Sequence, residues 1–179
     1  CISFIMLTIS INNGFKNEII SKIISIDGHT RVFHSSNIPL NNHDYEYIKG
    51  IYSSDYVNLG QVSSQNAILK KTNTSDGVVF NSINKEAYKA FDLEKFLING
   101  VINDSSVIVG SMLAEKLSIN LNDIVYIINY DLNNVVEVSV SGIFKTNIPI
   151  YDKHNIYGHK NTFNKFLGFD KNNFESIVI

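Results

Sequence analysis

The sequence CISFIMLTISI at residues 1–11 continues without a break into NNGFKNEIISKIISI at residues 12–26. The first stretch is apolar, but it is shorter than the roughly 20 residues that cross a bilayer. No basic region precedes it, so it lacks the pattern of a complete signal peptide. We therefore expect residues 1–12 to be the C-terminal end of a transmembrane helix. Residues 13–179 are expected to form the extramembrane core domain, incomplete at its C-terminus.

The second stretch has the spacing of an amphipathic helix, which would extend the membrane helix outward as a stalk. Its apolar residues recur at i, i+4, i+5, i+8 and i+9 and share one helical face: Phe15, Ile19, Ile20, Ile23 and Ile24. Gly28 is expected to end the helix, because glycine adopts the left-handed conformation common at helix ends. The pattern predicts a continuous, well-packed stalk.

Composition limits the function classes. The chain has 179 residues, 44% of them hydrophobic and 18% charged, which suits one sizeable folded domain or two small ones. Its net charge is −2 and Arg31 is its only arginine, which argues against a nucleic-acid partner. Cys1 is the only cysteine, so an intrachain disulfide and a cysteine-based zinc cluster are excluded.

The rest of the chain interleaves strand and helix patterns, which predicts an α+β domain with a mixed sheet. In 135–144, valines alternate with polar residues, as in a half-buried strand. Helix 111–118 is expected to bury Met112, Leu113 and Leu117, and residues 99–100 are expected to form a turn. The other expected helices are 45–49, part of 85–97 and a short one after 163, and the expected strands are 29–34, 51–58, 65–71, 77–81, 107–109, 124–128, 135–144 and 176–179.

Catalytic and metal-binding motifs are missing from the sequence. It contains no phosphate-binding loop, no G-x-G-x-x-G, no G-x-S-x-G and no H-E-x-x-H. The histidine pairs 29/34 and 154/159 are spaced i,i+5, which suits neither one helical face nor one strand face. His43 and Asp44 resemble a metal dyad, but their setting is that of a helix cap. We therefore expect a non-catalytic chain without metal or cofactor.

Three segments, in order, resemble one family. They are ISINNGFKNE at 9–18, VIVGSMLAEKL at 107–117 with Asn122-Asp123, and VSGIFKT at 140–146 with Tyr151-Asp152. This set resembles the periplasmic domain of permeases of the lipoprotein-releasing ABC transporter, within the macrolide-exporter-type permease superfamily. Asn122 and Asn147 stand where the family commonly has glycine, and asparagine is the other residue that tolerates positive φ.

The resemblance implies a fold, a location and partners. The fold would be a porter-like domain with an inserted subdomain, facing the periplasm from the bacterial inner membrane. The protein would release lipoproteins for transfer to the outer membrane. Its implied partners are a separate ATPase subunit that binds the ATP, a paired permease subunit, a periplasmic lipoprotein carrier, the lipoprotein substrate and the membrane.

The resemblance also implies two functional segments. A hairpin loop of this family hooks the carrier, and the matching residues here are Tyr130, Asp131, Leu132, Asn133 and Asn134. The same residues are also typical of an ordinary turn, so the sequence leaves open whether this loop binds a carrier or only connects two strands. The stalk residues Phe15, Ile19, Ile20 and Ile23 would transmit the movement driven by ATP hydrolysis.

Other functions also fit the sequence. Macrolide-exporter permeases carry a similar domain that contacts a membrane-fusion partner, and division-linked permeases use theirs to activate a cell-wall hydrolase. A membrane-anchored interaction or sensor domain without a linked ATPase is a further alternative. A hydrolase domain is disfavoured because no convergent set of titratable groups is visible.

Overall fold

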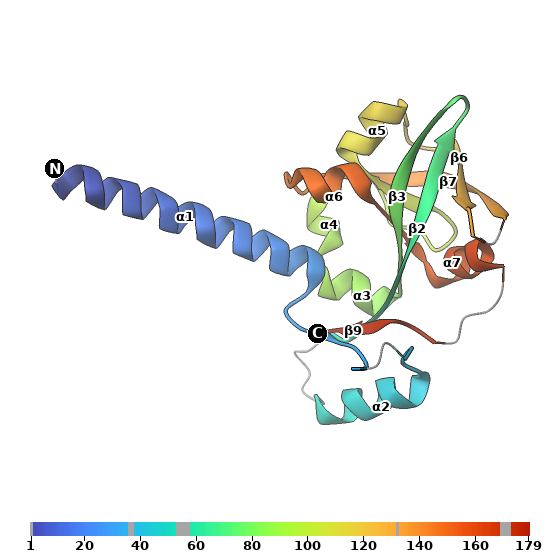
Figure 1. Ribbon diagram of the computed structural model, residues 1–179, viewed down its shortest axis with the longest axis horizontal. Coiled ribbons are helices and arrows are strands. Elements are labelled where there is room, and N and C mark those ends of the chain that lie inside the picture. The colour runs from blue at the N-terminus through green and yellow to red at the C-terminus, as the bar shows by residue number, and fades with distance from the viewer. Residues whose placement is uncertain (1, 36–37, 53–57, 132, 169–172) are drawn as a thin grey trace.

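A long N-terminal helix projects from a sheet domain (Figure 1). The computed structural model describes residues 2–35, 38–52, 58–131, 133–168 and 173–179. Helix α1 (Ile2–Asp27) is continuous over 26 residues, as the sequence predicts. Among the described residues, no helix has both the length and the apolar character needed to span a membrane.

The described part of the chain forms one nine-stranded sheet. Its order is β1-β9-β2-β3-β8-β5-β7-β4, and β6 pairs with β2 and β7. β3 is parallel to β8 and β5 is parallel to β7, whereas the other pairings are antiparallel. The strands are β1 (Arg31–Val32), β2 (Gly60–Lys71), β3 (Thr74–Ile83), β4 (Leu97–Gly100), β5 (Val107–Gly110), β6 (Ile124–Asn129), β7 (Asn134–Phe144), β8 (Asn155–His159) and β9 (Ser176–Val178). The predicted α+β class with a mixed sheet is confirmed.

In the described parts of the chain, six shorter helices join the strands. They are α2 (Asn42–Ile51), α3 (Lys85–Ala90), α4 (Leu93–Phe96), α5 (Ser111–Leu117), α6 (Pro149–His154) and α7 (Lys160–Leu167). Asn41 caps α2 in a capping box with Asp44, which agrees with the cap interpretation of this segment. Asn84 caps α3 and also accepts a hydrogen bond from the Gln61 backbone N–H at 3.2 Å, which ties α3 to β2.

Hydrophobic clusters cover both faces of the central strands. Val107 and Val109 belong to one cluster and Ile108 to the other, so β5 is buried on both sides. In the first cluster the Phe80 ring packs edge-on against Phe163 and Phe166, with centroids 5.2 and 5.4 Å away. Burial on both faces explains why β5 is an unbroken apolar run.

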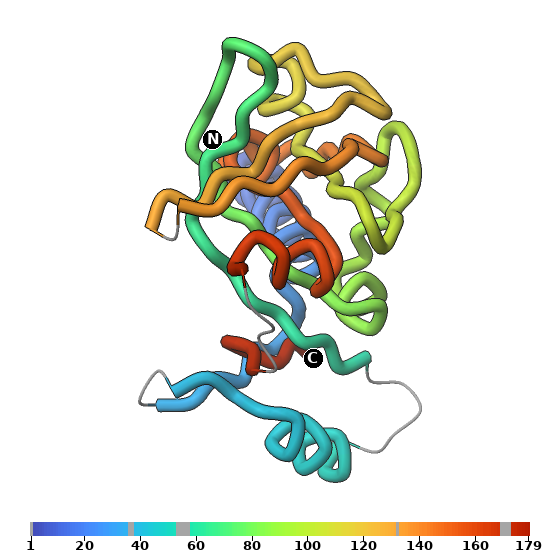
Figure 2. The backbone as a smooth tube through the Cα atoms, turned by 90° about the vertical axis from the view of Figure 1, so that its right-hand side faces the viewer, coloured from blue at the N-terminus to red at the C-terminus, as the bar shows by residue number. Residues whose placement is uncertain are grey.

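A third, smaller cluster holds the two ends of the chain together. Leu40, Leu59, Phe174 and Ile177 form its buried part. Figure 2 shows α2 and β1 at one end of the molecule, beside β9, and the β2–β3 hairpin tip at the opposite end. The segment after α1 and the C-terminal strand therefore form one unit at the base of α1.

Several local predictions are wrong. Met112 is exposed because it lies on the outer side of α5, whereas Leu113 and Leu117 are buried as predicted. Residues 51–52 end α2 instead of starting a strand, and residues 53–57 of that expected strand lie outside the described residues. Residues 99–100 belong to β4, because they pair with β7. Helix α6 and strand β8 were not expected.

Candidate functional site

The base of α1 is fixed to the C-terminal strand. Ile26 is only 1% exposed, in contrast to most of the helix. Gly28 follows the helix with φ +78°, and a Cβ there would lie 2.1 Å from Val178 Cγ1. The next two backbone N–H groups, of His29 and Thr30, donate to the Ile179 carbonyl at 3.0 and 3.2 Å. This close approach is possible because residue 28 is glycine.

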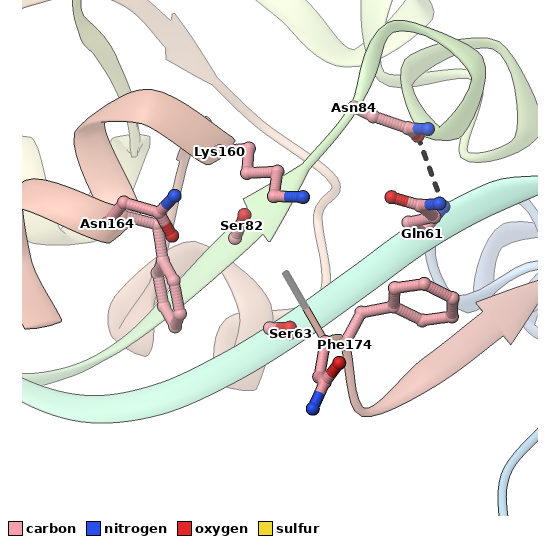
Figure 3. Close-up of a pocket in the computed structure, with 9 residues that line it drawn as sticks. Gln61, Ser63, Ser82, Asn84, Lys160, Asn164 and Phe174 are labelled. Atoms are coloured by element: carbon pink, nitrogen blue, oxygen red, sulfur yellow. Dashed lines mark hydrogen bonds between the residues drawn. The ribbon is translucent and has the colours of Figure 1, made fainter. Parts of the chain in front are cut away.

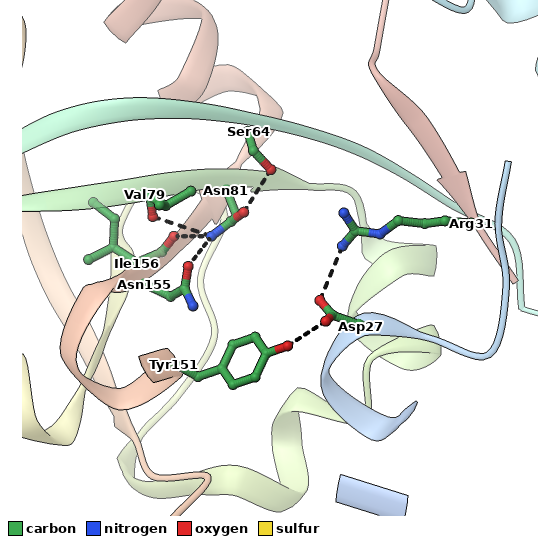
Figure 4. A network of polar contacts seen from close by, with 8 residues as sticks. All are labelled: Asp27, Arg31, Ser64, Val79, Asn81, Tyr151, Asn155 and Ile156. Atoms are coloured by element: carbon green, nitrogen blue, oxygen red, sulfur yellow. Dashed lines mark hydrogen bonds and ion pairs between the residues drawn. The ribbon is translucent and has the colours of Figure 1, made fainter. Parts of the chain in front are cut away.

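A polar link joins the same point to α6 (Figure 4). The Tyr151 hydroxyl donates a hydrogen bond to Asp27 Oδ2. Arg31 Nη2 lies 3.4 Å from Asp27 Oδ1. Burial, together with this hydrogen bond, raises the pKa of Tyr151 to about 12. Asp27 therefore connects α1, β1 and α6, and we call Asp27, Gly28, Arg31 and Tyr151 the stalk junction.

The residue after Tyr151 anchors α6 to the sheet. Asp152 is 2% exposed. Its Oδ1 accepts hydrogen bonds from Thr146 N at 2.7 Å and Thr146 Oγ1 at 2.8 Å, and its Oδ2 accepts one from Asn147 N at 3.0 Å. Thr146 and Asn147 lie two and three residues after the end of β7, so the Tyr151-Asp152 pair connects the stalk junction to the segment that leaves this strand.

A second polar network ties the strands behind the junction (Figure 4). The buried Asn81 amide donates to Asn155 Oδ1 at 3.1 Å and to the Ile156 carbonyl at 3.3 Å. Its carbonyl oxygen accepts a hydrogen bond from Ser64 Oγ at 2.8 Å. β2, β3 and β8 are therefore joined by side-chain hydrogen bonds as well as by their backbone pairing.

The β6–β7 hairpin forms as predicted, but its tip residues differ in solvent exposure and in their contacts with the rest of the domain. Tyr130 is 79% exposed, and Asp131 and Asn133 are also exposed. Asn134 is held by the end of α7, because its amide donates to the Phe166 carbonyl at 3.0 Å. Leu132 lies outside the described residues. Three of the five expected contact residues are thus open to a partner, and Asn134 has a structural contact.

The stalk residues form an uncovered face. Phe15, Ile20 and Ile23 are exposed and Ile19 is partly exposed. The expectation of a well-packed stalk is therefore wrong for this chain, because α1 projects away from the sheet domain (Figure 1). Continuity up to Asp27 is confirmed.

Ion pairs brace the β2–β3 hairpin against the α5 region. Lys71 Nζ lies 2.5 Å from Asp123 Oδ2, and Lys116 Nζ lies 2.6 Å from Asp76 Oδ2. The hydrogen bonds from these lysines lower the pKa of both carboxyl groups. Over the residues that the structure covers, no three His, Cys, Asp or Glu side chains come together to hold a metal ion. The two ion pairs join the β2–β3 hairpin to α5 and the turn that follows it.

No family model matches this chain. A curated relative is the lipoprotein-releasing system transmembrane protein LolC of Buchnera aphidicola subsp. Schizaphis graminum, which is 27% identical over 184 residues. The match covers 96% of this chain and 45% of the relative, so the chain spans less than half of that protein's length.

Two solved structures share the fold. The extracellular domain of the noncanonic ABC-type transporter YknZ from Gram-positive bacteria has a TM-score of 0.60 and 15% identity, covering 82% of this chain and 79% of that one. The periplasmic region of MacB from Actinobacillus actinomycetemcomitans has a TM-score of 0.61 and 18% identity, covering 87% and 75%. This is the fold of an extracytoplasmic ABC permease domain. The resemblance predicted from the sequence is confirmed.

Two residues of this permease-domain fold agree with the reasoning from the sequence. Asn122 and Asn147 have φ of +66° and +62°, the conformation inferred from asparagine in place of glycine. The sequence also singled out Tyr151 and Asp152, but it gave no indication of their contacts. Tyr151 and Asp27 are 124 positions apart, so only the fold brings them together.

The Tyr151→Phe variant tests the stalk junction. We expect its free energy of unfolding to be about 1 kcal/mol lower than wild type at neutral pH, because one hydrogen bond is lost. The raised pKa of Tyr151 favours the protonated hydroxyl in the folded state, so its contribution is present below pH 10 and is lost as the pH rises toward 12. Denaturant unfolding should show the difference between the two proteins shrinking over that range. A constant difference would contradict the role of the hydroxyl.

Proposed function

We propose that this chain is the extracytoplasmic domain of an ABC permease that releases lipoproteins from the inner membrane for transfer to the outer membrane. The relatives support the coarser part, an extracytoplasmic domain of an ABC transporter permease. The match to a lipoprotein-releasing protein over 96% of the chain supports the specific part of the proposal, which is lipoprotein release. The likeness to MacB and YknZ bears on the fold alone.

The geometry suggests how ATP hydrolysis would be coupled to movement of this domain. ATP is hydrolysed by a separate cytoplasmic subunit, and a paired permease subunit completes the transporter. α1 passes movement to the domain as a rigid rod, because it is unbroken up to a base fixed to β9 and α6. A load along α1 reaches β7 through Tyr151 and Asp152.

The carrier contact belongs to the same proposal. Tyr130, Asp131 and Asn133 are the exposed part of the hairpin tip and would meet a soluble periplasmic lipoprotein carrier. The base of the tip is firm, since Asn134 is bound to α7. A hairpin whose base is held in place and whose tip carries an exposed aromatic residue suits a docking site. Little conformational entropy is lost when such a hairpin is ordered on binding.

Substitutions on the apolar face of α1 test the coupling route. In the full-length transporter in vesicles, Ile19→Asp and Ile23→Asp should keep ATP hydrolysis but lower lipoprotein release to the carrier by about tenfold or more. The reason is that a carboxylate on this face opposes the apolar packing that a rod needs inside the assembled stalk. ATP hydrolysis and transfer of lipoprotein to added carrier are measured in the same preparation.

Ser21→Asp is the matched control, because it adds the same charge on the opposite side of α1. It should release lipoprotein like wild type. Unchanged release by Ile19→Asp and Ile23→Asp would contradict the coupling role. A full-length protein that exports a small molecule and releases no lipoprotein would instead support a macrolide-exporter-like permease.

A further inference from the structure

Asn99 and Gly100 form an asparagine–glycine step in β4, at an edge of the sheet. In the described chain, β4 ends the strand order and pairs with β7 alone. Both residues of the step are exposed. The register of the β4–β7 pairing shifts between Leu97 and Asn99, so the strand is irregular where the step lies. The step is therefore open to water from the edge of the sheet.

The fold requires glycine after Asn99. Gly100 has φ +88°. A Cβ on it would collide with the Ser141 carbonyl oxygen and would lie 2.7 Å from Gly142 Cα. Only glycine meets both conditions without strain. Asn99 is therefore followed by the least hindered backbone nitrogen that a chain can offer.

The N–H of Gly100 points away from β7. The Val101 N–H donates to the Ser141 carbonyl at 2.9 Å, beside the pair that Gly100 makes with Gly142. In an antiparallel ladder, a pair flanked in this way is the non-hydrogen-bonded kind, whose own N–H groups point outward. The Gly100 nitrogen is therefore directed to the free edge of the sheet and is not held in the ladder.

The side chain of Asn99 is also unrestrained. No described residue hydrogen-bonds to it. Other asparagines of the domain are held in place: Asn84 Oδ1 accepts the Gln61 backbone N–H at 3.2 Å (Figure 3), and Asn81 joins three strands. The Asn99 side chain is free to rotate, so its Cγ can approach the Gly100 nitrogen.

From this arrangement we propose that Asn99 is a deamidation site. The Gly100 nitrogen loses its proton to water and attacks Asn99 Cγ. A bond forms between these two atoms, the Cγ–Nδ2 bond breaks, and Nδ2 leaves as ammonia. Water then opens the succinimide ring, at Cγ to give aspartate or at the main-chain carbonyl to give isoaspartate. Either product adds a negative charge to the sheet edge, and isoaspartate also lengthens the backbone of β4.

The same dipeptide at Asn13 and Gly14 is an internal control. It is also exposed, but it lies inside α1 (Ile2–Asp27), where the Gly14 N–H belongs to the helical hydrogen-bond ladder. The helix must open before this nitrogen can attack, so the rate is reduced by the fraction of time that the helix is open. The two steps share one local sequence and differ in backbone structure.

Incubation of the full-length detergent-solubilised protein at physiological pH and temperature tests the proposal. Peptide mapping by mass spectrometry follows the conversion of amide to acid at both positions, and an isoaspartate methyltransferase detects isoaspartate. Synthetic peptides of residues 94–104 and 8–18 give the rates without the fold. After division by these peptide rates, Asn99 should react about tenfold or more faster than Asn13.

Variants assign the signal. Asn99→Gln should remove the isoaspartate from the β4 peptide, because glutamine must form a larger ring and reacts more slowly. Asn13→Gln, the matched change in α1, should leave the β4 signal as in wild type. Equal normalised rates at the two positions, a faster rate at Asn13, or an Asn99 that stays an amide while its free peptide deamidates would overturn the proposal.

Discussion

The Asp152→Ala variant is expected to lower the free energy of unfolding by about 4 kcal/mol. The carboxylate accepts three hydrogen bonds at 2.7–3.0 Å from the turn that follows β7. Without it, the buried N–H group of Thr146 and the partly buried N–H group of Asn147 lose their acceptor. Gly110 packs directly on the Asp152 backbone, so the loosening should also reach the end of β5. Denaturant unfolding of the 179-residue protein measures the loss.

Asp131→Ala is the matched control, because it removes a carboxylate from the exposed hairpin tip. Its stability should stay within about 0.5 kcal/mol of wild type. Asp152→Asn should fall between the two, since the amide keeps one acceptor oxygen but turns its NH₂ toward a backbone donor. Equal stability of Asp152→Ala and wild type would show that the turn after β7 is held by other contacts.

Local patterns were enough to predict elements that depend on neighbouring residues. Asn41 with Asp44 marks a helix start, and the structure has a capping box there. Val136, Val138 and Val140 alternate with polar residues, and all three are buried in β7. In both cases the determining contacts lie within a few residues along the chain, where sequence spacing shows them directly.

Elements that depend on distant pairing were missed. β8 is held between β3 and β5, which start about 80 and 50 positions earlier in the chain. Its sequence, NIYGH, has no alternation, because both faces of the strand are covered by core clusters. At 29–34, where a strand was expected, the structure has the two-residue strand β1, which pairs with β9. No local pattern in either segment indicates these partners.

The candidate site likewise has features that local sequence predicts and features that depend on distant contacts. The continuous α1 helix and the positive φ of Asn122 and Asn147 follow from local sequence. The contact of Tyr151 with Asp27 does not, because the two residues belong to opposite ends of the chain. The stalk face was expected to be packed because apolar spacing usually indicates burial. Spacing specifies which face is apolar, but it does not specify what covers it.

The second large effect is expected for Gly28→Ala. A Cβ at this position would come 2.1 Å from Val178 Cγ1, and the backbone has φ +78°. The left-handed conformation and the forced repacking against buried Val178 together should cost about 3 kcal/mol of unfolding free energy. The shift should break the hydrogen bonds of His29 and Thr30 to Ile179, since they lie next to the clash. Denaturant unfolding measures the stability, and the vesicle assay measures lipoprotein release.

Gly14→Ala is the control for this change. Gly14 lies inside α1 and no atom surrounds the position of its Cβ, so alanine should not lower stability. In the transporter, Gly28→Ala should hydrolyse ATP while releasing little lipoprotein, because the rod moves but its base no longer holds β9. A variant that unfolds more easily yet releases lipoprotein at the wild-type rate would separate the two roles. The junction would then stabilise the domain, and the movement would have to enter the sheet by another contact.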